Sequence, residues 1–295
     1  MRTVISALVL LVFLSQAAFP ADEEVTKLDV MVSITPQKYF LNQIASEFVN
    51  IHLMIPPGAN PATYEPKPSQ MEAINDMKAY FAIGVPFDIA WAGKIGRTNV
   101  NMPVVFTDHK VEKMSISDET IVKTVMGGKD LDPTLDPHIW LSPRLVKKQM
   151  ENYLRAMKII YNSQQELFTQ RYQEFLKELH ELDVEIKLMF KESGLSRRFM
   201  TYHPSWSYFA RDYDLIQVAI EQNGKEPSPA RMKELIDYAK EHDINTIFVE
   251  PQFSTKKAEA IAEAIGAKIV VLDPLAENWK DNLLSVATKI KESMK

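Results

Sequence analysis

The sequence predicts an α/β protein of two small β/α lobes with parallel sheets, joined by one long spine helix, with a ligand cleft between the lobes. Short apolar segments alternate with amphipathic segments in both halves of the 295-residue chain, a pattern typical of parallel sheets covered by helices. Between the halves, apolar residues recur at helical spacing from Ser163 to about Lys191, with no proline or glycine. At about 1.5 Å per residue this helix would be roughly 44 Å long, longer than one small domain is wide.

The spine helix carries a start signal. Ser163 and Glu166 have the spacing of a capping box, in which each side chain accepts a hydrogen bond from the other's backbone N–H. A sustained coiled coil is the alternative, but the apolar positions drift away from a strict seven-residue repeat. We therefore expect an N-terminal lobe of residues 21–161, a connecting helix of 162–192 and a C-terminal lobe of 193–295.

Strand and helix signals alternate along the N-terminal half. The first strand is expected to end at Thr35-Pro36 and the second before Pro56-Pro57-Gly58, because proline and glycine interrupt a strand. Ser69 is expected to cap the second helix. The predicted strands are 27–34, 51–55, 79–83 and 104–107, and the predicted helices are 37–48, 69–77, 87–95 and 142–161.

Residues 108–137 show no regular spacing of apolar residues. They are polar and include Gly127-Gly128 and several acidic residues, so we expect a long surface loop. Loops of this length are usually functional or disordered, and metal delivery by its acidic residues is one hypothesis. Acidic residues in this stretch include Asp118, Glu119, Asp130, Asp132 and Asp136.

The alternation resumes after the spine helix. Ser228 followed by Pro229 is the favoured pair at a helix start, since serine caps the helix and proline suits its first position. Ser254 is a second expected cap, for a helix that ends at Gly266. The predicted strands are 198–202, 215–220, 246–249 and 268–272, and the predicted helices are 206–211, 228–241, 254–266 and 278–292.

Composition and the N-terminus predict an exported soluble protein. A formal net charge of −5 argues against a nucleic-acid partner held by a basic surface. Residues 1–20 have a positive start, an apolar run from Val4 to Leu14 and a small-residue cleavage site, so they are predicted to be a secretory signal peptide. The chain has no cysteine, so neither a disulfide nor a lipid-bearing cysteine is expected. We expect a periplasmic protein without a lipid anchor.

Polar residues gather where the predicted strands end, the usual place for ligands in parallel sheets. Histidine and carboxylate side chains occur in several of these segments, and both are metal ligands. The segments are GANPATYEP (58–66), DPHIWLSP (136–143), YHP (202–204), EPQF (250–253) and LDPL (272–275).

These segments resemble those of the metal-binding receptors of bacterial zinc and manganese ABC importers. The resemblance covers nearly the whole mature chain and rests chiefly on DPHIWLSP and YHPSWSYFARDYDL. It implies two lobes joined by one long helix, with a divalent metal in the cleft between them. By this resemblance His138, His203 and Asp273 are the metal ligands, and Glu250 lies close behind them. His52, His180 and His242 are expected to be structural or solvated.

Two departures from the family pattern concern the metal. The family usually has a histidine ligand where this chain has Ala62, so a water molecule, Asn60, Glu65 or Glu250 would complete the site. The loop at 108–137 lacks the histidine-rich tract of many zinc members. Zinc is the metal that the resemblance favours, and mixed imidazole and carboxylate ligands also suit manganese or iron.

Three functions follow as hypotheses. The first is a receptor that captures zinc and delivers it to an ABC permease in the inner membrane, acting as a monomer. The second keeps the fold but has an altered, possibly metal-free, site for another ligand or serves as an interaction module. The third is a zinc hydrolase, which would need a general base such as Glu250; no nucleophile elbow, phosphate loop or H-E-x-x-H motif supports it, so we expect no enzymatic activity.

Overall fold

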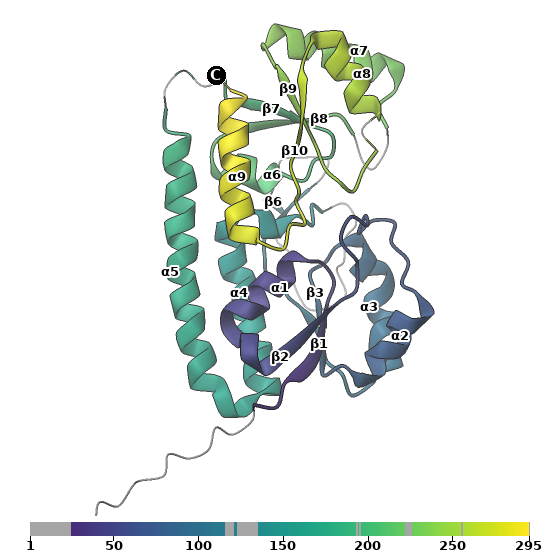
Figure 1. The fold of residues 1–295 in the computed structure, drawn as a ribbon, viewed down its shortest axis with the longest axis vertical. Coiled ribbons are helices and arrows are strands. Elements are labelled where there is room, and N and C mark those ends of the chain that lie inside the picture. The colour runs from purple at the N-terminus through teal and green to yellow at the C-terminus, as the bar shows by residue number, and fades with distance from the viewer. Residues whose placement is uncertain are drawn as a thin grey trace, which may run out of the picture.

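A computed structural model shows one four-stranded parallel sheet in each half of the chain (Figure 1). The strands are β1 (Leu28–Val32), β2 (Val49–Leu53), β3 (Ala79–Ala82), β4 (Val104–Phe106), β7 (Arg198–Thr201), β8 (Ile216–Ala219), β9 (Thr246–Val249) and β10 (Lys268–Val271). The strand order is β2-β1-β3-β4 in the N-terminal sheet and β10-β9-β7-β8 in the C-terminal sheet. The structure describes residues 25–115, 121–122, 135–192, 194, 196–221, 226–254 and 256–294.

Proline begins every α-helix between the strands of the N-terminal lobe, because it needs no N–H partner in the first turn. The helices are α1 (Pro36–Ala45), α2 (Pro68–Ala73) and α3 (Pro86–Thr98), with 3-10 turns η1 (Ser46–Phe48) and η2 (Ile74–Asp76) after the first two. The prediction that Ser69 caps α2 is wrong. Pro68 already occupies the first helical position, and Gln70 reaches back to accept from the Lys67 backbone N–H at 2.9 Å.

The C-terminal lobe follows its predicted elements closely. Its helices are α6 (Ser207–Asp212), α7 (Pro229–Glu241), α8 (Lys256–Ile265) and α9 (Trp279–Glu292). Ser228 caps α7 as predicted, since its side chain accepts from the Arg231 backbone N–H at 3.2 Å and Pro229 follows it.

The spine helix α5 (Gln165–Met189) runs along one side of the molecule past both lobes (Figure 1). Its 25 residues correspond to about 37 Å. Helix α4 (Pro143–Ile160) precedes the spine helix and lies beside it. A tight 3-10 turn, η4 (Asn162–Gln164), connects the two helices. The predicted capping box is wrong, because Ser163 lies inside this turn and cannot cap the helix. The fully buried stripe that holds α5 in place is Phe168, Phe175, Leu179, Leu182 and Ile186.

One continuous hydrophobic core includes residues of both lobes and of the spine helix. Trp279, at the start of α9 in the C-terminal lobe, packs on Tyr39 and Phe40 of α1 with ring centroids 5.8 and 5.1 Å apart. Its indole N–H donates to the Trp140 carbonyl at 2.7 Å, and the Trp140 indole donates to the Pro274 carbonyl at 2.7 Å. We call these two hydrogen bonds the tryptophan clamp. It ties the two lobes together next to the cleft.

The prediction of a polar surface loop over residues 108–137 is partly wrong. Strands β5 (Lys113–Met114) and β6 (Ile121–Val122) form a short antiparallel pair inside it. Asp108 and Lys113 are both 5% exposed and form an ion pair at 2.6 Å, packed against Gly84 at a positive φ of 84°. Asp118, Glu119, Asp130 and Asp132 lie outside the described residues, as does the predicted signal peptide. No helix in the described part of the chain is long and apolar enough to cross a membrane.

Candidate metal centre

A cavity of about 860 Å³ lies between the two lobes, where the carboxyl ends of both sheets meet. The N-terminal lobe contributes the segment after β2, with Asn60 and Ala62, and the segment before α4, with His138. The C-terminal lobe contributes His203 after β7 and Gln252 after β9. The topology thus brings predicted site segments that are far apart in sequence to one place.

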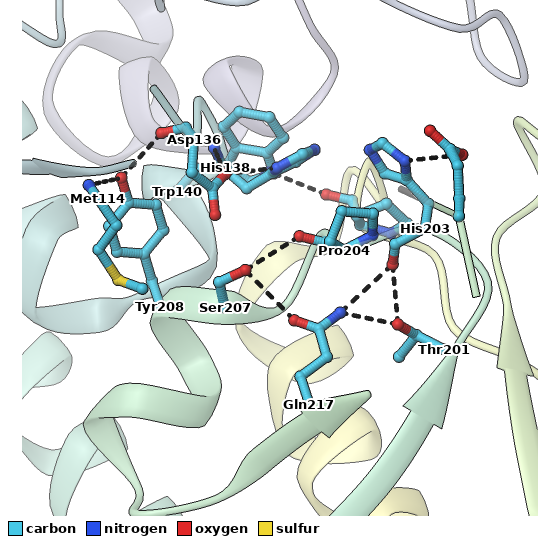
Figure 2. A network of polar contacts seen from close by, with 12 residues as sticks. Met114, Asp136, His138, Trp140, Thr201, His203, Pro204, Ser207, Tyr208 and Gln217 are labelled. Atoms are coloured by element: carbon cyan, nitrogen blue, oxygen red, sulfur yellow. Dashed lines mark hydrogen bonds and ion pairs between the residues drawn. The ribbon is translucent and has the colours of Figure 1, made fainter. Parts of the chain in front are cut away.

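His138 is held by Asp136, two residues before it. Asp136 is 4% exposed, and its Oδ1 accepts from both the backbone N–H of His138 at 2.9 Å and the ring Nδ1 at 2.7 Å. Tyr208 of α6 donates its hydroxyl to the Asp136 carbonyl at 2.8 Å and accepts from the Met114 backbone N–H at 2.8 Å (Figure 2). The C-terminal lobe therefore helps to fix the segment that carries His138.

His203 is held by a second carboxylate. Its Nδ1 lies 3.1 Å from Oε2 of Glu221, which is 6% exposed. One ring face stacks on Phe253 at a centroid distance of 4.3 Å. Burial lowers the pKa of His203 below its ordinary value of 6.5, although the hydrogen bond to Glu221 works in the opposite direction. The neutral ring is the form that binds a metal.

The two imidazoles lie against each other, with ring centroids 5.3 Å apart at an angle of 72°. A carboxylate can only accept a hydrogen bond, so Nδ1 carries the proton in both neutral rings and Nε2 presents a lone pair. Figure 2 shows the hydrogen bond of each ring directed away from the other ring. Among the described residues, neither Nε2 makes a hydrogen bond. A histidine whose far nitrogen is fixed by a carboxylate is the usual arrangement of a zinc ligand.

Asp273, the third predicted ligand, lies beside the cavity and does not line it. Its Oδ1 accepts from Gln252 Nε2 at 2.8 Å and from the Leu275 backbone N–H at 2.9 Å. Gln252 and Leu275 line the cavity themselves. In the described residues no group of three or more His, Cys, Asp or Glu side chains is arranged to hold a metal.

Glu250 lies behind His203, as the sequence suggested. It is 1% exposed, and its Oε2 accepts from the His203 backbone N–H at 3.2 Å. Burial raises the pKa of Glu250 well above its ordinary value. Asn60 is occupied by its own loop, where its Oδ1 accepts from the Ala62 backbone N–H at 2.8 Å.

Sequence reasoning missed the positioning roles of Asp136, Glu221 and Gln252. Asp136 and Gln252 were inside the segments singled out, DPHIWLSP and EPQF, but only the histidine and the glutamate were considered there. Glu221 follows β8 at the edge where His203 also emerges, and this position was the signal that could have found it.

The contact between Glu221 and His203 gives a first prediction. Glu221→Leu is expected to lower zinc affinity about 10- to 100-fold, the usual effect of removing the group that orients a ligand histidine. Glu221→Gln keeps an acceptor for Nδ1–H and should lose much less. Competition with a chromogenic chelator would measure both affinities. Equal losses in the two variants would contradict an orienting role.

Residues 30–293 match the protein family described as "Zinc-uptake complex component A periplasmic". The chain belongs to this family. The high-affinity zinc uptake system protein ZnuA of Bacillus subtilis is 29% identical over 259 residues, which are 86% of this chain and 81% of the relative. The zinc-binding lipoprotein AdcA of Streptococcus pneumoniae is 27% identical over 292 residues, 91% of this chain, and the chain spans only 55% of AdcA. A crystal structure of ZnuA has a TM-score of 0.83 at 39% identity, covering 91% of this chain and 100% of that one.

Membership in the zinc-uptake family confirms the resemblance inferred from the motifs and the predicted class, a solute-binding receptor of a zinc importer. The two-lobed α/β fold with a spine helix is also confirmed. The predicted ligand set remains a prediction. The structure brings His138 and His203 together and leaves Asp273 bonded to Gln252.

Proposed function

We propose that this protein is the receptor of an ABC importer, that it captures zinc outside the cytoplasm, and that it delivers the ion to a permease in the inner membrane. In this proposal residues 1–20 direct export, no lipid anchor is attached, and the receptor works as a monomer without enzymatic activity. Family membership supports the class of protein and zinc as the cargo. A ZnuA deletion mutant with zinc bound, 39% identical and with a TM-score of 0.82, supports the same cargo.

The facing pair of imidazoles is the observation that carries the proposal. His138 and His203 come from different lobes and present Nε2 lone pairs to one cavity, while buried carboxylates fix their far nitrogens. Imidazole nitrogen suits zinc, which accepts a water molecule in an open position. We assign these two residues as ligands. Asp273 is the proposed third ligand, and its carboxylate must leave Gln252 to reach the metal.

Calorimetric titration of the metal-stripped mature protein with zinc, and separately with manganese, tests this function. We expect one zinc ion per chain and weaker binding of manganese, because imidazole ligands favour zinc in the usual affinity order. A folded protein that binds neither ion would contradict the proposal. That result would favour the alternative of a same-fold receptor or interaction module with another ligand.

Zinc binding should depend on pH through His203. Zinc and a proton compete for Nε2, and burial lowers the pKa of this imidazole below 6.5. The pH at which protonation of His203 halves the zinc affinity should therefore lie below 6.5, with affinity falling as the pH falls further. Titrations between pH 5 and 8, compared with His203→Ala, would measure it. A His203-dependent halving of the affinity at a pH above 6.5 would contradict the burial effect.

Zinc release is expected to need only a small movement of the lobes. The hydrophobic core is continuous through both lobes and α5, and the tryptophan clamp joins them beside the cavity. A wide opening would expose this core. A modest shift that separates His138 from His203 would be enough to weaken binding, because each lobe supplies one of the two imidazoles.

A further inference from the structure

We propose that Gln252 determines metal specificity by opposing the movement of Asp273 into the metal site. The inference rests on the proposed function, since it concerns which ligands join the two histidines. Strands β9 and β10 are paired and parallel, with Val249 opposite Val271, so Gln252 and Asp273 emerge side by side at the cavity edge of the sheet. Gln252 faces the cavity and Asp273 lies behind it.

The hydrogen bonds show how Asp273 is held. Two donors converge on its Oδ1, the Gln252 side-chain amide and the Leu275 backbone N–H. The second bond closes a local turn that Asp273 forms with its own loop. Gln252 is therefore the side chain that fixes the carboxylate from outside this loop. Among the described residues, no hydrogen bond to Asp273 Oδ2 is present.

Gln252 keeps this contact in spite of an unfavourable environment for its other amide atom. Because a carboxylate only accepts, the amide must present Nε2 to Asp273, which fixes the direction of Oε1. Oε1 is buried and has no partner among the described residues. An unpartnered buried acceptor destabilises the structure. Gln252 nevertheless keeps this orientation, so its bond to Asp273 outweighs the cost of leaving Oε1 without a partner.

This arrangement favours zinc over manganese. Zinc binds well to imidazole and accepts water in the remaining positions, whereas manganese prefers carboxylate oxygen. Among the described residues that line the cavity, two are imidazoles and the one carboxylate, Asp136, is already bonded to His138. Recruiting Asp273 requires breaking the bond to Gln252, and manganese depends on that recruitment more than zinc does.

The test measures zinc and manganese affinities of the metal-stripped protein and of Gln252→Leu, which has a similar volume and no amide. We expect manganese affinity to rise about tenfold or more and zinc affinity to rise less, so that the zinc-to-manganese affinity ratio falls. Gln252→Asn, whose amide is one methylene shorter, should change the ratio in the same direction if the leucine variant does not fold. Ser207→Ala, another cavity-lining change, is the control that should leave the ratio unchanged.

The double variant Gln252→Leu with Asp273→Asn decides whether the carboxylate is responsible. We expect the gain in manganese affinity to disappear in it, a result that a general loosening of the site would not produce. A gain that persists without Asp273, or an unchanged ratio in both Gln252 variants, would overturn the inference while leaving zinc capture intact. Failure of the unaltered protein to bind zinc would overturn the proposed function and this inference with it.

Discussion

Replacing His138 by alanine is expected to lower zinc affinity by about 100-fold or more, beyond the 10- to 100-fold typical of losing a group that only orients a ligand. The site brings together two imidazoles, so the variant loses half of its nitrogen ligands and all of those from the N-terminal lobe. His203→Ala should have a comparable effect from the other lobe. Calorimetric titration with competing chelator would measure both.

His52→Ala is the matched control for these variants. His52 lies on β2, is half-exposed and pairs with Asp29 at 2.8 Å, outside the residues that line the cavity. Its removal should leave zinc affinity unchanged. If His138→Ala and His52→Ala bound zinc equally well, the two-histidine site would be wrong.

Replacing Trp279 by alanine is expected to cost about 3–5 kcal/mol of the free energy of unfolding, the range for losing a large aromatic side chain from a core. Trp279 is 1% exposed, packs on two aromatic rings of the opposite lobe and donates to the Trp140 carbonyl. The variant leaves a cavity at the lobe interface and a buried carbonyl without its donor. Urea unfolding, followed by circular dichroism, would measure the change.

Trp91→Ala is the comparison for the tryptophan clamp. Trp91 is partly exposed on α3, stacks on Phe87 and lies beneath the Lys94 ammonium, so truncation removes less buried surface. Its loss of stability should be well under half that of Trp279→Ala. Trp279→Phe should fall between them, because it keeps most of the packing and loses the hydrogen bond. Equal unfolding midpoints for the two alanine variants would mean that the clamp does not stabilise the interface.

The fold could be predicted from the sequence because its signals are local. Alternating apolar segments and the apolar stripe from Phe168 to Ile186 report on burial within one element. The predicted ends of helices were wrong where the chain turns tightly. Serine is a favoured capping residue, but the turn from α4 into α5 places Ser163 inside η4. No local sequence pattern shows where such a turn lies.

The site could be predicted only in part because its geometry depends on contacts between distant segments. The motifs identified His138 and His203, and the parallel sheets bring them together. The positions of Asp136 and Glu221 behind the rings depend on side-chain directions that spacing does not give. Spacing also does not reveal the position of Asp273. The motif suggests that it is a ligand, but its carboxylate accepts a hydrogen bond from Gln252, 21 residues earlier in the chain.

Zinc K-edge X-ray absorption of the one-to-one complex would test the central claim most directly, that zinc binds between the imidazoles of His138 and His203. The account predicts two imidazole nitrogens at about 2.0–2.1 Å, with oxygen ligands completing the coordination. The His138→Ala complex, loaded at high zinc concentration, should show one imidazole. A spectrum without imidazole scattering, or one that is identical in the variant, would contradict the account.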